Sequence, residues 1–292
     1  MPDNQREAYN RIETVMATCQ YLPGGDSGFS EGKDMVHEFD GKKYEAFSAP
    51  QKEWGAQLIS ELSLKGHERV LDLGCGDGTN AARIAELLPQ GDVVAIDASK
   101  GMIDAAKHKE RMNVRFILMD IDRMDFTNAF DVIYSNATLH WVKDHQRLLR
   151  NVSRALRKGG LLRCNFAADG NCSHFIRVIR KAMDRGEFAG YFETFVWPWY
   201  MPSVDAYRRL THNSELQEVR VWGENADRFF PDTEALTGWI DQPSLVPFLA
   251  SVAEKDKAAF REYVIGEMIQ ETRQADGRYF ETFRRINLSA RK

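Results

Sequence analysis

The sequence predicts an α/β protein in which a parallel sheet carries a helical cap. Between residues 68 and 168, short apolar segments alternate with helical segments at close spacing, as in successive βα units. The first apolar segment leads directly into a turn with three alternating glycines, Gly74, Gly76 and Gly78. Glycine lets a ligand approach the backbone, and the next helix would point its N-terminal N–H groups toward that ligand. The last third of the sequence lacks this alternation, which favours a cap on one α/β domain over two independent domains.

The elements of the core follow in a regular order. Ser99 is placed to cap the helix after the second strand, and Gly159-Gly160 is a strong stop signal for a later helix. Strands are expected at residues 69–73, 92–97, 113–119, 130–135 and 161–167. Helices are expected at residues 79–88, directly after Ser99, at 146–157 and at 172–185.

Two regions flank this core. Before it, we expect an amphipathic piece at 9–20, a loop with five glycines between Gly24 and Gly41, and a helix at 50–62. After it, an aromatic-rich segment at 188–200 precedes further elements. These are a strand at 216–222, helices at 233–240, 244–253 and 255–274, and a strand at 278–289. The chain therefore divides into a helical lid segment at 1–64, an α/β core at 65–185, and a cap insertion with two further strands at 186–292.

Composition excludes several classes of function. The net charge of −4 and the absence of a long basic run argue against a nucleic-acid partner. No run of 18 apolar residues is present, so we expect no membrane span. The first residues lack a signal-peptide pattern, the four cysteines lack C-x-x-C spacing, and the histidines lack metal-ligand spacing. We expect a cytoplasmic protein with reduced cysteines and no metal.

One motif narrows the choice of cofactor. In the run Val70-Leu-Asp-Leu-Gly-Cys-Gly-Asp-Gly-Thr-Asn80 an acid precedes the glycines, and Thr79 stands where a dinucleotide fingerprint has its last glycine. The form D-L-G-C-G-D-G resembles motif I of the class I S-adenosylmethionine-dependent methyltransferases. This resemblance implies a Rossmann-like sheet of seven strands with the last antiparallel. Segments 216–222 and 278–289 would be its sixth and seventh strands.

The resemblance also implies which residues hold S-adenosylmethionine. Asp72 would face the ammonium group, and the glycine turn would accommodate the methionine part. Asp97, about twenty residues past the glycines, is placed for the ribose hydroxyls, and Asp120 for the adenine amino group. Asn136 follows the fourth strand at the sheet edge where ligands of such folds bind. The full set of expected cofactor contacts is Asp72, Gly74, Cys75, Gly76, Asp97, Ala98, Met102, Asp120, Ile121 and Asn136.

A narrower resemblance covers more of the chain. The segment 130–142 is similar to the corresponding segment of trans-aconitate methyltransferases and of juvenile hormone acid methyltransferase, although the former usually carry Gln where this chain has His140. The trans-aconitate group is also resembled by residues 39–44 before the helix of Trp54, and by the C-terminal pattern of 238–239, 247–249, Phe260, Tyr263 and 276–280. The region through about Gly32 departs from that pattern.

Methyl transfer from a sulfonium needs orientation and exclusion of water more than proton transfer. A carboxylate acceptor is already ionised at neutral pH, whereas a phenol or amine would need a base, for which His140 is the candidate. His140 could equally be a structural residue packed beside Trp141, which we expect in the pocket wall. An arginine or tyrosine would recognise a carboxylate acceptor, and Arg208, Arg209 and Arg285 are available besides the chosen contacts. The expected substrate contacts are Tyr44, Trp54, His140, Trp141, Tyr279 and Arg284.

These features predict a methyltransferase acting on a small molecule, by O-methylation of a carboxylate or hydroxyl, as a monomer or homodimer. The alternatives are a methyltransferase acting on protein or RNA, and a non-catalytic module that binds the cofactor. We further expect residues 39–54 to close over the bound ligands, with Tyr44 in contact. The alternative is that this segment is permanently docked.

Overall fold

The computed structural model describes residues 38–41 and 49–292. The expected amphipathic piece at 9–20, most of the glycine-rich loop, and Tyr44 lie outside the described residues. Within the described part, no helix is long and apolar enough to cross a membrane.

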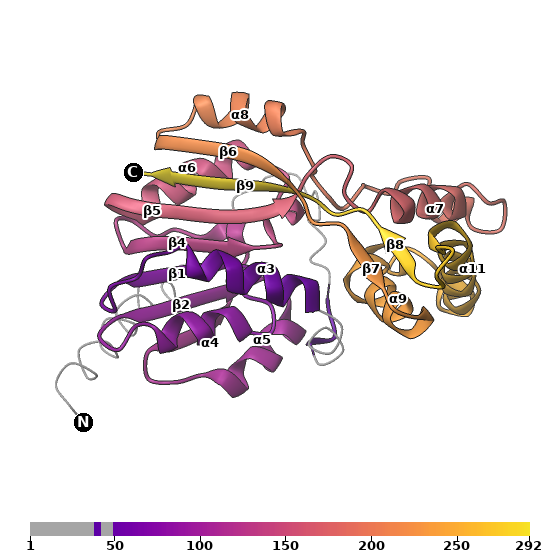
Figure 1. The fold of residues 1–292 in the computed structure, drawn as a ribbon, viewed down its shortest axis with the longest axis horizontal. Coiled ribbons are helices and arrows are strands. Elements are labelled where there is room, and N and C mark those ends of the chain that lie inside the picture. Colours follow the sequence, from indigo (N-terminus) through magenta and orange to yellow (C-terminus); the bar gives the residue numbers. More distant parts are fainter. Residues whose placement is uncertain (1–37, 42–48) are drawn as a thin grey trace, which may run out of the picture.

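A seven-stranded sheet forms the centre of the molecule (Figure 1). Its strands are β1 Arg69–Leu73, β2 Asp92–Asp97, β3 Val114–Leu118, β4 Phe130–Asn136, β5 Leu156–Ala167, β6 Gln217–Asn225 and β9 Arg284–Arg291. The strand order is β3-β2-β1-β4-β5-β9-β6, and β9 runs antiparallel to both of its neighbours. This confirms the predicted seven-stranded sheet with its last strand antiparallel.

Alternating side chains of the strands divide the core into two layers. Val70 on β1 packs in a cluster with helices on one face of the sheet, while Leu71 joins a separate cluster on the other face. Both side chains are fully buried, as expected for parallel strands covered on both faces. The helices of the first layer are α3 Ala49–Ser60, α4 Thr79–Glu86 and α5 Lys100–Ala106. Those of the second are α6 His145–Ala155 and α8 Val204–His212.

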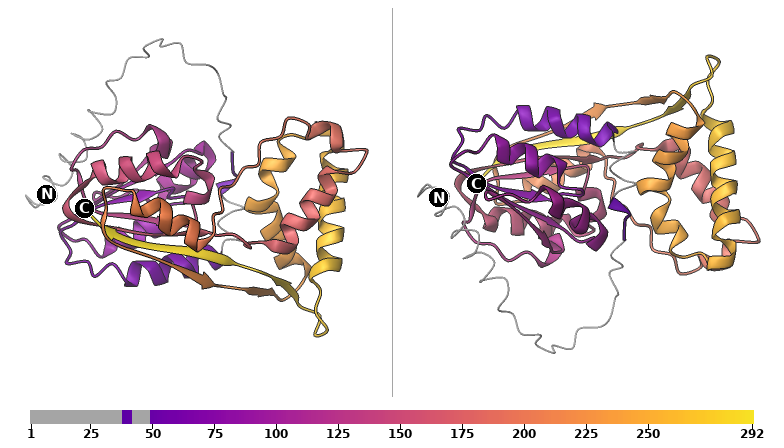
Figure 2. Two further views of the ribbon diagram at one scale, coloured as in Figure 1. Left: turned by 90° about the horizontal axis from the view of Figure 1, so that it is seen from above. Right: turned by 90° about the horizontal axis from the view of Figure 1, so that it is seen from below.

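A helical cap lies beyond the carboxyl ends of the parallel strands (Figures 1 and 2). It comprises α7 Ser173–Met183, α9 Thr233–Trp239, α10 Val246–Leu249, α11 Glu254–Thr272 and a hairpin of β7 Arg228–Phe230 with β8 Tyr279–Glu281. The cap has its own apolar core, in which Phe175, Phe248 and Phe260 are fully buried. The sheet and the cap therefore present two facing surfaces between which a ligand can be enclosed.

The predicted single strand at 278–289 is wrong. It is divided after Glu281, so that β8 pairs with β7 in the cap and β9 pairs with β5 and β6 in the sheet. The buried Glu281 carboxylate accepts hydrogen bonds from the backbone N–H of His174 and Phe175 at the start of α7. Two residues after Glu281, the N–H of Phe283 donates a hydrogen bond to the side chain of Asp227. These contacts from distant segments fix the break.

Other helix and strand boundaries also differ from the predicted ones. Helix α6 ends at Ala155 rather than near 157, because residues from Leu156 onward already belong to β5. Helix α8 and strand β7 were not predicted. Ser99 does cap α5, where its hydroxyl accepts a hydrogen bond from the N–H of Met102.

Candidate functional site

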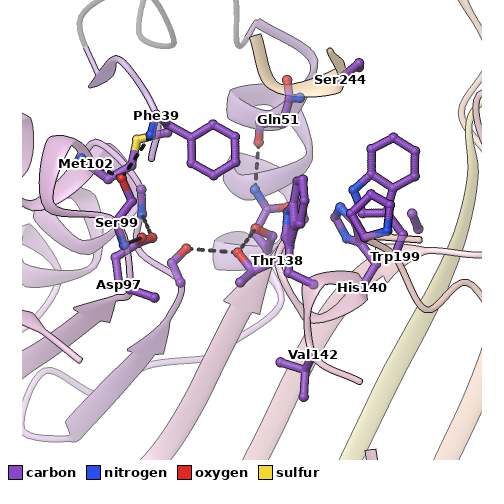
Figure 3. A pocket seen from close by; sticks show the side chains of 18 of the residues that line it. Phe39, Gln51, Asp97, Ser99, Met102, Thr138, His140, Val142, Trp199 and Ser244 are labelled. Carbon is purple, nitrogen blue, oxygen red and sulfur yellow. Dashed lines mark hydrogen bonds between the residues drawn. The ribbon is translucent and has the colours of Figure 1, made fainter. Parts of the chain in front are cut away.

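A cavity of about 750 Å³ lies between the carboxyl edge of the sheet and the cap. Its lining comes from the turns after β1, β2, β3 and β4, from the start of α3, from the segment 191–201 that joins α7 to α8, and from residues of the cap and of β9. Figure 3 shows Asp97, Ser99, Met102 and Phe39 at one end of this cavity and His140 with Trp199 at the other. The site thus has two halves, one against the strand ends and one against the cap.

The glycine turn forms the floor of the first half. Gly74 has φ of +72°, and a Cβ at this position would overlap the side chain of Thr138. The N–H groups of Gly74 and Cys75 both donate to the carbonyl of Ile96 on β2, at 2.8 and 3.0 Å. The turn is therefore pressed against the neighbouring strand, and Gly74, Cys75 and Gly76 are all exposed to the cavity.

Two carboxylates stand beside this turn in different surroundings. Asp97 lines the cavity, and its oxygens accept hydrogen bonds from the N–H of Gly76 and of Ser99, each at 2.9 Å. Burial raises the pKa of Asp97, and these two N–H groups oppose that rise. Asp72 is buried below the turn and is not part of the cavity lining. Burial, reinforced by the negative charges of Asp97 and Asp77, raises the pKa of Asp72 to about 8.

Asp72 is also short of hydrogen bonds. Its Oδ2 atom is buried and has no hydrogen-bond partner among the described residues. A carboxyl group held in this way is stabilised by a cationic ligand, because a positive charge favours the ionised form that burial alone opposes. The arrangement fits a ligand with a positive group near the glycine turn.

The remaining expected cofactor residues line the same half of the cavity. Asp120 accepts a hydrogen bond from the N–H of Asp122, and Asn136 donates from Nδ2 to the carbonyl of Gln51 on α3. The Oδ1 atom of Asn136 is buried without a partner among the described residues. The structure thus brings together on the cavity wall Gly74, Cys75, Gly76, Asp97, Ala98, Met102, Asp120, Ile121 and Asn136.

His140 faces the second half of the cavity from a short 3-10 turn, Leu139–Trp141. Burial lowers the pKa of His140 well below its usual value, and the positive charge of Arg285 lowers it further. The imidazole is therefore neutral at pH 7, and its Nδ1 atom has no hydrogen-bond partner among the described residues. Next to it, Trp141 packs edge-to-face on Trp199 with ring centroids 5.7 Å apart.

Arg285 brings a positive charge to this half. It is buried on β9 opposite Ala167, lines the cavity, and donates a hydrogen bond to the side chain of Asn165. Its guanidinium carbon lies 4.3 Å from the ring centroid of Trp54, in cation–π geometry. A buried arginine at a cavity wall is suited to an anionic group on the ligand.

The expected substrate contacts have different positions. Trp54, His140 and Trp141 line the cavity, whereas Tyr279 and Arg284 do not. Tyr279 is buried in the cap core, and Arg284 forms an ion pair with Asp227. The structure does not place Tyr44.

Some lining residues were not singled out from the sequence. The hydroxyl of Thr138 donates a hydrogen bond to the carbonyl of Gly74 at 3.0 Å, and the backbone carbonyl of Gln51 accepts one from the side chain of Asn136. Both are ordinary polar residues with no distinguishing pattern. In the sequence, Arg285 was one of several arginines that could bind a carboxylate. Side chains alternate between the two faces of β9, and in the structure Arg285 lines the cavity whereas Arg284 does not. Among the residues that the structure describes, no group of acids, cysteines and histidines could hold a metal ion.

Comparison with known proteins agrees with this geometry. A family described as "Methyltransferase domain" matches residues 70–160. The "Trans-aconitate 2-methyltransferase" of Deinococcus radiodurans is 30% identical over 238 residues, covering 80% of this chain and 88% of that protein. The protein of the same name from Acidovorax ebreus is 26% identical over 263 residues, covering 88% of this chain and 99% of its own length.

Solved structures show the same fold. The phosphoethanolamine N-methyltransferase 2 of Haemonchus contortus, in complex with S-adenosyl-L-methionine, aligns with a TM-score of 0.57 at 18% identity. That alignment covers 93% of this chain and 61% of the longer protein. The YcgJ protein of Bacillus subtilis aligns with a TM-score of 0.55 at 17% identity, covering 82% of this chain and 98% of that one.

Proposed function

This chain belongs to the class I S-adenosylmethionine-dependent methyltransferases, in the trans-aconitate methyltransferase group, and we propose that it methylates a carboxylate oxygen of a small acceptor. Its cofactor is S-adenosylmethionine, which supplies an electrophilic methyl group when bound.

The first half of the cavity fits the cofactor. Asp97, on the cavity wall, suits the ribose hydroxyls. Asp72 is buried behind that wall, and its Oδ2 atom has no hydrogen-bond partner among the described residues, so it suits the ammonium of the methionine part, directly or through a water molecule. Gly74 lines the cavity without a side chain, so a ligand can approach the backbone there. Asp120 and Ile121 would hold the adenine further along the strand ends, with Met102 against the ring.

The observation that carries the proposal is Arg285 in the second half. The Arg285 guanidinium is buried and lines the cavity, and a planar guanidinium can form paired charge-assisted hydrogen bonds with an acceptor carboxylate. Arg285 would hold the carboxylate and orient one carboxylate oxygen toward the methyl group of the bound cofactor. The neutral His140 would orient that oxygen by a hydrogen bond and need not accept a proton, because the acceptor is already ionised.

The experiment pairs two neighbouring arginines. Methyl transfer to a panel of small carboxylic acids is measured for the wild type, for Arg285→Gln, and for the matched control Arg284→Gln, whose side chain binds Asp227 outside the cavity. Loss of a charge-assisted contact of about 1.5–3 kcal/mol should raise KM for the acid by roughly 10- to 100-fold in Arg285→Gln. Affinity for S-adenosylhomocysteine should remain as in the wild type.

The product identifies the reaction type. A methyl ester is hydrolysed by mild base, whereas a methyl ether is not, so mass spectrometry before and after base treatment separates carboxylate from hydroxyl acceptors. Equal KM values for the two arginine variants would remove Arg285 from acceptor binding, and a base-stable product would contradict carboxylate methylation. The second outcome would favour a hydroxyl acceptor with His140 as the base. The imidazole is neutral, and its Nδ1 atom has no hydrogen-bond partner within the described part of the chain.

A further inference from the structure

The acceptor half of the cavity is walled by aromatic rings. Five of the six tryptophans of the chain line the cavity. Trp197 and Trp199 pack edge-to-face with centroids 5.6 Å apart, and Trp199 also contacts Phe248 of the cap core. The aromatic residues on the cavity wall are Phe39, Trp54, Trp141, Tyr191, Phe195, Trp197, Trp199, Trp239 and Phe283.

The charges on the wall are unevenly divided between the two halves. The four lining acids, Asp77, Asp97, Asp120 and Asp122, all follow β1, β2 or β3 in the cofactor half. The cations among the described lining residues are Lys52, Lys143 and Arg285, of which Arg285 alone is buried.

Lys143 lines the cavity but is exposed to solvent. Its ammonium group donates a hydrogen bond to the carbonyl of Trp197. Partial burial of the ammonium lowers the pKa of Lys143. Lys52 is half-buried at the start of α3, so among the described lining residues Arg285 is the one cation whose side chain is buried.

From this wall we infer that the acceptor is a monocarboxylic acid with an apolar body, and not a polycarboxylic acid. The inference rests on the proposed carboxylate methylation and names its substrate class. The single carboxylate would pair with Arg285, while the hydrocarbon part would lie against the indole rings of Trp141, Trp197 and Trp199.

A tricarboxylic acid fits this wall poorly. It would bring two further carboxylates against indole rings with one buried guanidinium to balance three charges, and an unpaired charge in apolar surroundings is strongly disfavoured. An apolar body gains from the same rings, since each methylene removed from water improves binding. This chain would therefore differ in acceptor from the relatives whose names refer to trans-aconitate.

The test is a length series. Initial rates with S-adenosylmethionine are measured for straight-chain monocarboxylic acids of four to ten carbons and for trans-aconitate, under identical conditions. We expect kcat/KM to rise about fourfold for each methylene that becomes buried, until the cavity is filled. The best monocarboxylic acid should exceed trans-aconitate by at least about 100-fold in kcat/KM, equivalent to about 2.7 kcal/mol.

Two tryptophan variants test whether the expected preference for longer acids comes from the aromatic cavity wall. Trp197 and Trp222 are matched, because each lies under an arginine guanidinium, from Arg180 at 5.2 Å and from Arg163 at 4.8 Å. Trp197 lines the cavity, whereas Trp222 lies on β6 outside it. Trp197→Leu should reduce the gain in kcat/KM along the acid series about tenfold at its longer end, and Trp222→Leu should leave the series unchanged.

The outcomes separate this inference from the proposed function. A preference for trans-aconitate, or a kcat/KM independent of acid length, would overturn the apolar acceptor and leave carboxylate methylation standing. Equal effects of the two tryptophan variants would remove the aromatic wall from acceptor binding. No methyl ester from any acid, with S-adenosylhomocysteine still bound, would overturn both.

Discussion

Cofactor binding should release a proton from Asp72. With a pKa of about 8, this carboxyl group is protonated in the ligand-free protein at pH 6.5, whereas a bound ammonium group requires the carboxylate. Allowing for the cofactor's own amino group, whose pKa is near 7.8, about 0.9 proton should leave per cofactor bound at that pH. The same linkage should weaken binding by roughly tenfold between pH 7 and pH 6.

Calorimetry in buffers of different ionisation enthalpy measures this proton directly. S-Adenosylhomocysteine is compared with methylthioadenosine, which has the same nucleoside but no amino acid part, and with the Asp72→Asn variant. Methylthioadenosine and the variant should each release far less than one proton. Equal proton release from both ligands, or from wild type and variant, would show that Asp72 does not face the ammonium.

The raised pKa also affects the stability of the ligand-free protein. Between about pH 4 and pH 8, Asp72 is protonated in the native state but ionised in the unfolded state. The contribution of Asp72 to the free energy of unfolding should therefore fall as pH rises through this window. Denaturant titration across the window checks the sign, and Asp72→Asn should flatten the profile. A contribution that instead grew with pH would contradict the burial argument.

Three further predictions concern the cofactor half. Gly74→Ala should lower the free energy of unfolding by about 1–3 kcal/mol and weaken cofactor binding, because φ of +72° and overlap with Thr138 both oppose a Cβ. An unchanged melting temperature and an unchanged cofactor affinity would refute this. Asp97→Ala should weaken S-adenosylhomocysteine binding by roughly 10- to 100-fold in calorimetry, and an unchanged affinity would remove Asp97 from the site. Phe39 lines the cavity and its N–H donates to the hydroxyl of Ser99, another lining residue, so residues 38–41 should gain protection from hydrogen exchange when the cofactor product binds. Identical protection with and without ligand would mean that this segment is scaffold rather than lid.

Local sequence patterns were enough to locate the βα core. The apolar runs of β1 and β2 and the glycine turn define a strand, a tight turn and a helix within a few residues of each other, and such signals do not depend on distant parts of the chain. Ser99 as a helix cap belongs to the same kind, because its partner is the N–H of Met102 three residues away. The clustering of cofactor candidates at the strand ends followed from the rule that parallel strands share one ligand-binding edge.

The acceptor half was not determined in this way. Arg284 and Arg285 are neighbours in the sequence, and only the pairing of β9 with β5 decides that Arg285 reaches the cavity. The break after Glu281, which sets the start of β9, depends on hydrogen bonds to α7 more than a hundred residues earlier.

The sequence by itself therefore determined the fold class and the candidate cofactor residues at the strand ends, since these follow from period, capping and glycine geometry within short windows. Only the tertiary structure decided the burial that raises the pKa of Asp72 and which of two neighbouring arginines lines the cavity. Burial and strand register are set by contacts between segments far apart in the chain, and a one-residue change of register turns a side chain to the opposite face of the sheet.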